Sequence, residues 1–233
     1  MGEHMDFGNR TVIVTGGTGA LGIAVVGALL DAGAQCRVPY LIDAEADSFP
    51  HRDRVTLVPR CDLTDESDVD RLYDGVSNLW ASIHLAGGFG MGDLADTDKD
   101  SLMRMLNMNL VSCYLCCRRA LAAFGPEGGR IVNVAARAAL EPRQGAGTTA
   151  YTVSKAGVSA LTQALAAEVV QQNVLVNAVA PAVIDTPANR AAMPRADHQR
   201  WPSPAEIAAT VGFLAAPDNE VTTGGVVPVY GRA

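Results

Sequence analysis

The sequence predicts a single α/β domain in which helices cover both faces of one doubly wound, parallel sheet. Short apolar stretches rich in β-branched residues alternate with longer stretches of helical periodicity along the whole chain. Glycine-rich turns follow several of the predicted strands, and no linker or repeat divides the 233 residues. This alternation is typical of βαβ units, whose strands run parallel. We expect one domain over residues 1–233, with a flexible start at residues 1–9.

The composition is that of a globular protein, with 48% apolar and 18% charged residues. A net charge of −7 argues against nucleic acid or an anionic membrane surface as a partner. No apolar run approaches the roughly 18 residues that suggest a membrane span, so no membrane association is expected. The first nine residues do not resemble a secretion signal. We therefore expect a cytoplasmic protein.

The cysteines are interpreted as packing residues rather than as metal ligands. Cys113-x-x-Cys116 lies in an apolar stretch of helical periodicity, and no second cysteine or histidine pair stands at ligand spacing. Reduced thiols are the default for a chain without an export signal. No metal site is therefore expected. The chain has five cysteines, namely Cys36, Cys61, Cys113, Cys116 and Cys117.

The first βα unit carries a dinucleotide-binding pattern. Residues 10–15 form an apolar, β-branched stretch that predicts a buried strand, and residues 15–22, TGGTGALG, form a glycine-rich turn. An apolar helix over residues 23–32 follows and ends at Gly33. Glycines let a backbone approach a pyrophosphate, and a helix N-terminus offers amide donors and a positive dipole end. This unit therefore predicts a dinucleotide site.

The end of the second strand, expected over residues 35–42, leaves the choice between NAD and NADP open. A carboxylate there would bind the adenosine ribose, whereas a basic residue would bind a 2′-phosphate. Pro39 and Tyr40 occupy the expected tip, with Asp43 three residues after Tyr40 and Arg37 before it.

The remaining elements continue the alternation. Further strands are expected at residues 55–59, 79–85, 130–134, 174–179 and 226–229. One helix is expected to start at Thr64 and to continue through Tyr73, and others are expected at residues 100–124, 150–170 and 204–215. Connections are expected at residues 89–93, at 135–149 as a loop or short helix, and at 185–204 as a loop that closes over the site.

Ligands in such sheets bind beyond the carboxyl ends of the strands, so one edge gathers the candidate sites. The segments that follow strands there are residues 15–22, 86–88, 135–137 and 181–186. Tyr151 and Lys155 lie four apart in a predicted helix, so their side chains share one face. An ammonium beside a phenol favours the phenolate, which suits the tyrosine to proton transfer.

These motifs together resemble the short-chain dehydrogenase/reductase family over essentially the whole chain. The matching pieces, in the family's order, are the loop 15–22, Asp62-Leu63, Ala86-Gly87-Gly88, Asn109, Ile131-Val-Asn-Val134, Tyr151-x-x-x-Lys155, Asn177-Ala-Val-Ala-Pro181 and Thr186. The resemblance implies a Rossmann fold that binds NAD or NADP and transfers hydride to or from a small molecule.

The resemblance also implies roles for individual residues. Tyr151 would exchange the proton, Lys155 would hold the nicotinamide ribose and lower the pKa of Tyr151, and Asn109 would hold a water in a proton relay. The loop 15–22 would contact the pyrophosphate. The implied cofactor-binding residues are Gly16, Thr18, Ala20, Leu21, Gly22, Tyr40, Asp62, Leu63, Ala86, Gly87, Gly88, Tyr151, Lys155, Pro181, Ile184 and Thr186.

The chain departs from the family pattern after the fifth strand. A serine that donates to the substrate carbonyl is usual there, but residues 135–138 read AARA. Losing one such donor typically costs about 3–4 kcal/mol of transition-state stabilisation. Either the substrate does not need the donor, or Thr148 or Thr149 replaces it, or the protein is a poor enzyme.

The dihydropteridine reductase branch of the family lacks this serine, and the chain resembles it in residues 86–90 and 135–140. Residues 185–190, DTPANR, with Met193, Pro194 and Trp201, resemble that branch's substrate-side segment, here residues 186–203. The branch usually uses NADH, which gives a slight lean toward NAD. This favours a quinonoid dihydropteridine as substrate, with a small conjugated or carbonyl compound as the broader class.

Two alternatives stay open. The first is a 3-oxoacyl or ketone reductase that uses Thr148 or Thr149 in place of the serine. The second is a weakly catalytic dinucleotide-binding or sensor protein. The predicted helices 100–124 and 150–170 are apolar around much of their circumference, which calls for burial on more than one side. The family forms a four-helix contact with these helices, so a homodimer or homotetramer is expected.

Overall fold

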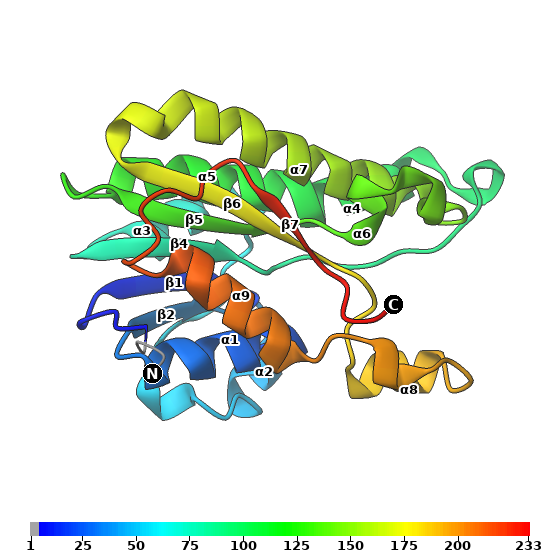
Figure 1. Ribbon diagram of the computed structural model, residues 1–233, viewed down its shortest axis with the longest axis horizontal. Helices are drawn as coiled ribbons and strands as arrows, with labels where there is room; N and C mark the ends of the chain where they lie inside the picture. The colour runs from blue at the N-terminus through cyan, green and yellow to red at the C-terminus, as the bar shows by residue number, and fades with distance from the viewer. Residues whose placement is uncertain (1–4) are drawn as a thin grey trace.

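The computed structural model describes residues 5–233, which form one seven-stranded parallel sheet with the order β3-β2-β1-β4-β5-β6-β7. Helices lie on both of its faces (Figure 1). The predicted α/β class and the doubly wound parallel sheet are therefore confirmed. The strands are β1 (Thr11–Thr15), β2 (Gln35–Pro39), β3 (Thr56–Val58), β4 (Leu79–His84), β5 (Gly129–Val134), β6 (Val174–Pro181) and β7 (Val226–Val229).

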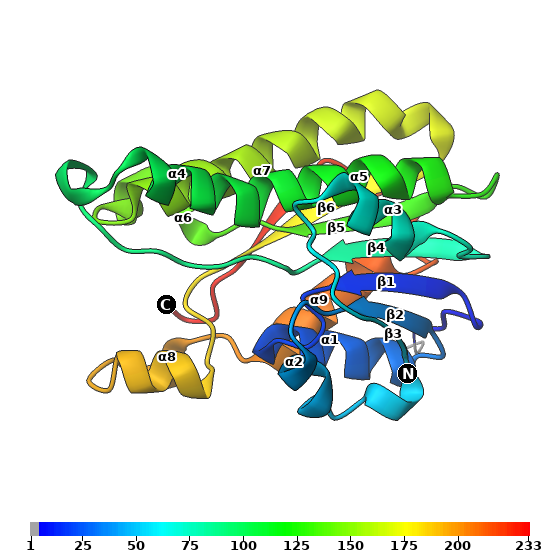
Figure 2. The same ribbon diagram turned by 180° about the vertical axis from the view of Figure 1, so that it is seen from behind.

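The helices form two layers. Helices α3, α4, α5 and α7 lie along one face, while α1 and α9 pack together on the other (Figures 1 and 2). The helices are α1 (Ala20–Asp31), α2 (Asp43–Asp47), α3 (Glu66–Tyr73), α4 (Lys99–Leu106), α5 (Ser112–Ala123), α6 (Arg137–Leu140), α7 (Thr149–Val169), α8 (Pro187–Ala192) and α9 (Pro204–Ala215). None of the helices within residues 5–233 has the length and apolar character needed to cross a bilayer.

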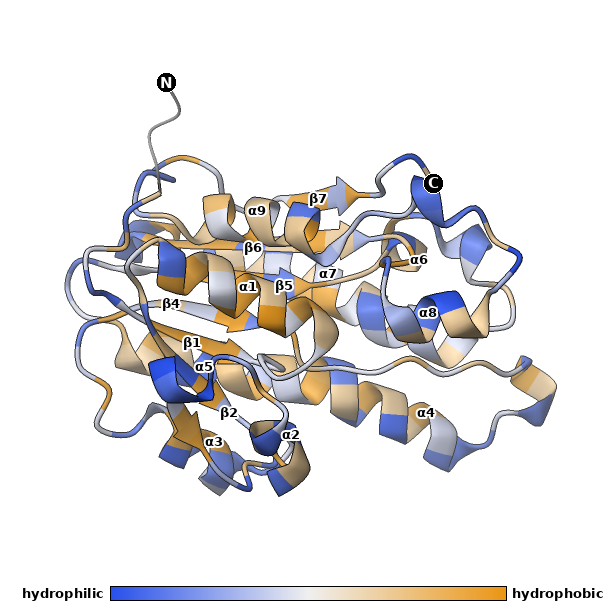
Figure 3. Cartoon of the chain, turned by 90° about the horizontal axis from the view of Figure 1, so that it is seen from below, coloured by the Kyte–Doolittle hydropathy of each residue, from blue (hydrophilic) through white to orange (hydrophobic). Residues whose placement is uncertain are grey.

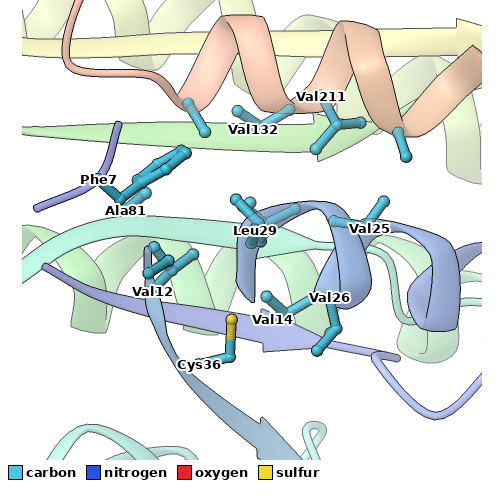
Figure 4. Packing of buried hydrophobic residues seen from close by; sticks show 14 of the residues in the cluster. Phe7, Val12, Val14, Val25, Val26, Leu29, Cys36, Ala81, Val132 and Val211 are labelled. Atoms are coloured by element: carbon cyan, nitrogen blue, oxygen red, sulfur yellow. The ribbon is translucent and has the colours of Figure 1, made fainter. Parts of the chain in front are cut away.

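The central strands form because their residues can be buried on both sides. Every residue of β4 and β6 is buried, as is typical of central strands in a parallel sheet. In Figure 3 the hydrophobic colour dominates β1 and α1, whereas β4 is paler because its sequence also includes polar residues. On one face, Val12 and Val14 of β1 meet Val25 and Leu29 of α1 (Figure 4). Phe7, within the stretch that we expected to be flexible, is fully buried in the same core, whereas residues 1–4 lie outside the described residues.

Three segments differ from the sequence predictions. The single helix expected at residues 100–124 is interrupted by a π-helical turn, Asn107–Val111, which separates α4 from α5. The expected loop at residues 185–204 contains α8, whose Thr186 cap accepts a hydrogen bond from the Asn189 amide. The five-residue helix α2 was not predicted, because so short a segment shows no periodicity.

Candidate active site

The glycine-rich turn between β1 and α1 forms one wall of a cavity of about 550 Å³. Gly16 has a φ of +66°, and a Cβ there would lie 2.7 Å from the Ala86 amide nitrogen, so glycine is needed at this close approach. Gly19 begins α1 without a side-chain cap, which leaves the first amides of the helix available to an anion. The cavity is lined by Gly16, Thr18, Gly19, Ala20, Leu21, Gly22, Pro39, Tyr40, Leu41, Glu45, Cys61, Asp62, Leu63, Thr64, Leu85, Ala86, Gly87, Met108 and Ser112.

The far end of this first cavity, beyond β2, carries a carboxylate that sequence reasoning missed. Glu45 lines the cavity beside Tyr40, and its Oε2 accepts hydrogen bonds from the Leu41 and Ile42 amides at 3.2 and 3.4 Å. Arg37 points elsewhere, because its Nε donates to the Leu72 carbonyl at 2.8 Å. Among the described residues that line the cavity, none is a lysine or arginine. The signal for Glu45 would have been its position three residues after Ile42, the residue that caps the N-terminus of α2, had α2 been predicted.

A second cavity of about 560 Å³ adjoins the first, and Gly87 lines both. This second cavity lies beyond the carboxyl ends of β4, β5 and β6, the edge where the sequence predicted the site. Its walls are largely apolar, with a few polar side chains, as is usual for small-molecule sites. It is lined by Gly87, Gly88, Phe89, Val134, Ala135, Ala136, Arg137, Ala138, Gln144, Thr148, Tyr151, Lys155, Pro181, Ala182, Val183, Ile184, Asn189, Met193 and Ala233.

Tyr151 and Lys155, one turn apart on α7, both reach this second cavity. The Lys155 ammonium donates to the Val134 carbonyl at 2.8 Å, and burial lowers the pKa of Lys155 to about 8. Burial raises the pKa of Tyr151 to about 12. The ring of Phe89 packs edge-on against that of Tyr151, with centroids 4.9 Å apart. In the protein alone, removal of the phenol from water dominates the pKa of Tyr151, and the lowering of this pKa by Lys155 stays a prediction.

Asn109 lies in the π-helical turn, where its buried side chain contacts the segment that follows β4. Its Oδ1 accepts from the Gly88 amide at 2.9 Å, and its Nδ2 donates to the Gly88 carbonyl at 3.1 Å and to Ser154 Oγ at 3.0 Å. The Asn109 side chain therefore fixes the backbone of Gly88, next to Gly87, which lines both cavities. Its role in a water relay remains a prediction.

The second cavity is lined by Ala136 where the family usually has serine, so this position offers no hydroxyl. Thr148 lines the cavity, and its Oγ1 donates to the Gly145 carbonyl at 3.0 Å, whereas Thr149 is exposed and is not among the lining residues. Arg137, which sequence reasoning did not single out, is held by Glu141 at 2.9 Å and lies over the Tyr230 ring at 4.9 Å.

The structure brings together nearly all of the cofactor-binding residues expected from the sequence. Asp62 and Leu63 line the first cavity, and Pro181 and Ile184 line the second. Thr186 is the exception, because it caps α8 and lines neither cavity. Asn189 and Met193, within the segment expected on the substrate side, line the second cavity, whereas Gln144 was missed because it lies in a connection whose course no pattern specifies.

The residues present fit a dinucleotide. Two adjoining cavities share Gly87, the turn at Gly16 leaves no room for a Cβ, and the N-terminus of α1 is uncapped. The first cavity offers the anion-binding amides, and the second places Tyr151 and Lys155 where a nicotinamide and a substrate would meet. Such a cofactor supplies or accepts the hydride when it is bound.

Comparison with known proteins agrees with this arrangement. A family model described as "Enoyl-(Acyl carrier protein) reductase" matches residues 17–231. Galactitol 2-dehydrogenase of Rhizobium johnstonii is 35% identical over 95% of this chain and 93% of its own. The 3-oxoacyl-[acyl-carrier-protein] reductase MabA of Mycobacterium tuberculosis is 29% identical, with coverages of 99% and 95%.

A solved structure shows the same fold over nearly the whole chain. The short-chain dehydrogenase/reductase of Brucella melitensis, described as a glucose/ribitol dehydrogenase, superimposes with a TM-score of 0.83. It is 25% identical and covers 99% of this chain and 98% of its own. With the glycine turn, Tyr151 and Lys155 in place, the chain belongs to the short-chain dehydrogenase/reductase family of NAD(P)-dependent oxidoreductases.

Proposed function

We propose that the protein interconverts a secondary alcohol and its ketone, with NAD(H) preferred over NADP(H). The observation that carries this proposal is the position of Tyr151 in a largely apolar cavity that adjoins the dinucleotide cavity at Gly87. The Tyr151 phenol is protonated at neutral pH, so it can give its proton to a carbonyl oxygen as hydride arrives on the carbon. The relatives named above, a galactitol dehydrogenase and a 3-oxoacyl reductase, support a hydroxyl or carbonyl substrate.

Thr148 takes the part of the absent serine in this proposal. It is half-buried, lines the same cavity as Tyr151, and carries a hydroxyl, whereas Ala136 offers none. Its present bond to the Gly145 carbonyl can be exchanged for a bond to a substrate oxygen by rotation about χ1. A donor aimed at the carbonyl oxygen stabilises the negative charge that develops there.

The preference for NAD follows from the charge of the first cavity. Glu45 is an acidic lining residue beside Tyr40, and the lining residues include no basic side chain among those described. The 2′-phosphate of NADP would therefore meet a carboxylate without a compensating cation.

The second candidate function is reduction of a quinonoid dihydropteridine, which the absence of a hydroxyl at Ala136 favours. Such a substrate takes hydride on a conjugated ring and a proton on nitrogen, so a carbonyl donor is not needed. The relatives named above do not share that substrate, which makes the alcohol and ketone pair the stronger proposal.

One set of assays separates these functions. Consumption of NADH is followed by absorbance with ketoses, 3-oxoacyl thioesters and quinonoid dihydropteridine as acceptors. Thr148→Val is compared with Thr149→Val, which removes the same group from a neighbouring exposed residue. We expect ketone or thioester reduction to fall about tenfold to a hundredfold in Thr148→Val alone.

Two other outcomes would replace the proposed alcohol and ketone reaction with a different function. Turnover only with the dihydropteridine, unaffected by Thr148→Val, would replace the proposal with the second candidate. Cofactor binding without turnover on any acceptor would favour the weakly catalytic sensor.

A further inference from the structure

Behind the second cavity, four ligating side chains that the proposed reaction does not use converge between the sheet and α5. His84 ends β4, Asn133 lies on β5, and Cys113 and Cys117 are one turn apart on α5. All four are buried, with exposures of 3%, 0%, 4% and 2% respectively. The imidazole and thiol ligand atoms all lie within 4.8 Å of one another.

The four distances from the sulfurs to the nitrogen and oxygen donors are close to the edges of a tetrahedron. Cys117 Sγ and Cys113 Sγ lie 3.5 and 3.9 Å from His84 Nδ1, and 3.6 and 3.3 Å from Asn133 Oδ1. Nδ1 and Oδ1 are 2.8 Å apart. Typical zinc–ligand bonds of about 2.0–2.3 Å in tetrahedral geometry require ligand-to-ligand distances of about 3.4–3.8 Å. The nitrogen–oxygen edge is well below this range and the edge from Cys113 Sγ to Asn133 Oδ1 is slightly below it, so binding requires a rotation of the His84 or Asn133 side chain.

Neighbouring groups already orient the imidazole and the amide toward the sulfurs. His84 Nε2 is 2.9 Å from Ser82 Oγ, which is in turn 2.6 Å from the Tyr73 hydroxyl. Asn133 Nδ2 donates to Thr162 Oγ1 at 2.9 Å, so the amide oxygen faces the cysteines. A hydrogen bond on the far nitrogen of a histidine is the usual device that fixes a metal-binding imidazole.

We propose that His84, Cys113, Cys117 and Asn133 bind a thiophilic divalent cation of the zinc type. Two thiolates balance the charge of such an ion, so the buried site carries no net charge. Binding breaks two S–H bonds, releases two protons and forms two metal–sulfur bonds without any change in oxidation state. The imidazole proton moves from Nδ1, where it bonds Asn133 Oδ1, to Nε2, which then donates to Ser82 Oγ. The ion would tie α5 to β4 and β5. Since the ligands are buried, we expect it to enter during folding.

This site was not predicted from the sequence, because the Cys-x-x-Cys pattern draws attention to Cys113 and Cys116 rather than to Cys113 and Cys117. On a helix, however, the residue that shares a face with Cys113 is Cys117. His84 and Asn133 come from separate strands, and only the sheet brings them together.

The test is the metal content of the full-length chain. The protein is produced in zinc-supplemented medium without a histidine tag, purified without chelators, and analysed by native mass spectrometry and elemental analysis. Cys113→Ser and Cys117→Ser are compared with Cys116→Ser, which removes an equally buried thiol from the same helix. We expect one zinc ion per chain in the wild type and in Cys116→Ser, and at least a tenfold lower zinc content in the other two variants.

A second measurement needs no variant. Protein refolded with Co²⁺ should show sulfur-to-cobalt charge-transfer absorption and the strong visible bands of a tetrahedral site. Folded wild-type protein that contains no zinc and gives no such spectrum would overturn the proposal and leave a metal-free hydrogen-bonded network. Equal zinc content in all variants would also overturn it.

Discussion

Asn109 holds Gly88 through both of its backbone groups, accepting from the amide at 2.9 Å and donating to the carbonyl at 3.1 Å. These two hydrogen bonds connect the π-helical turn to the backbone after β4, where Gly87 lines both cavities. Because the asparagine is only 1% exposed, water cannot readily replace it as a partner for Gly88. The shape of the site therefore depends on this one side chain.

Replacing Asn109 by alanine should weaken both stability and cofactor binding. The Gly88 amide and carbonyl would be left without partners, which typically costs about 1–3 kcal/mol in the free energy of unfolding. Urea unfolding and NADH titration measure the two effects. Ser154→Ala, which loses one bond to Asn109 but leaves Gly88 held, should affect NADH binding much less. Equal losses in the two variants would contradict the importance of the Gly88 contacts.

Tyr151→Phe should abolish turnover while leaving the cofactor bound. The variant keeps the ring that packs against Phe89 but lacks the proton to be transferred. A loss of about a hundredfold to ten-thousandfold in kcat is expected for a general acid. Steady-state rates and nucleotide fluorescence titrations check the two parts. A variant that retains full activity would exclude Tyr151 as the proton donor.

Buried Lys155 should make stability depend on pH in an identifiable window. Its pKa is lowered to about 8 in the folded protein by burial, against the ordinary value of 10.5. Below pH 8 both states carry the proton, and the full desolvation cost is present. Between pH 8 and pH 10.5 the unfolded chain retains a proton on Lys155 that the folded chain has lost. The free energy of unfolding therefore rises as the pH increases through this window.

The comparison with Lys155→Met isolates this contribution, because the tyrosines and cysteines titrate in both proteins. The difference in free energy of unfolding, variant minus wild type, should decrease by about 3 kcal/mol from pH 8 to pH 10.5. Denaturant unfolding at a series of pH values measures it. A difference that stays constant across the window would show that Lys155 is not perturbed by burial.

Glu45→Gln should relax the cofactor preference. The amide can still accept from the Leu41 and Ile42 backbones, but the negative charge near the adenosine end is removed. We expect the ratio of kcat/KM for NADPH to that for NADH to rise roughly tenfold. Asp43→Asn is the matched control, because Asp43 is paired with Arg60 at 3.1 Å and does not line the cavity. A similar change in both variants would exclude a specific role for Glu45.

Exposed apolar side chains on one helical layer predict self-association. Met103 on α4, Tyr114 on α5 and Val153 on α7 are 41%, 53% and 49% exposed. These helices lie side by side (Figure 2). We expect at least a dimer through this layer, and Tyr114→Asp should give monomers of about 24 kDa. Light scattering coupled to chromatography measures the mass.

The control for this prediction lies on the opposite face of the sheet. Phe213 of α9 is 55% exposed, and Phe213→Arg should leave the dimer through α4, α5 and α7 intact. A monomeric wild-type protein would contradict the prediction.

The central part of the sheet could be predicted because strands β4 and β6 are buried on both sides. Residues 174–179 were predicted from apolar, β-branched character alone, and β6 covers them with every residue buried. Tyr151 and Lys155 were found because helical spacing places residues four apart on one face, and both line the second cavity.

The missed features depend on contacts between distant segments. The π-helical turn at Asn107–Val111 requires a shift in backbone hydrogen bonding that no residue type specifies. Glu45 reaches the first cavity only because the short helix α2 turns it there. Whether the pKa of Tyr151 is raised or lowered depends on how deeply the phenol is buried, which spacing along a helix does not reveal.

Gly87 has a consequence for the design of variant libraries. A Cβ at this position would lie 2.5 Å from Asn109 Oδ1 and 3.3 Å from Lys155 Nζ, and both atoms are held by hydrogen bonds, to the Gly88 amide and the Val134 carbonyl. At Gly88, by contrast, the obstacle is the flexible end of Met108. Libraries that aim to change the substrate range can therefore vary position 88 together with Met108. Position 87 must remain glycine, because a side chain there would displace Asn109 or Lys155 where the two cavities meet.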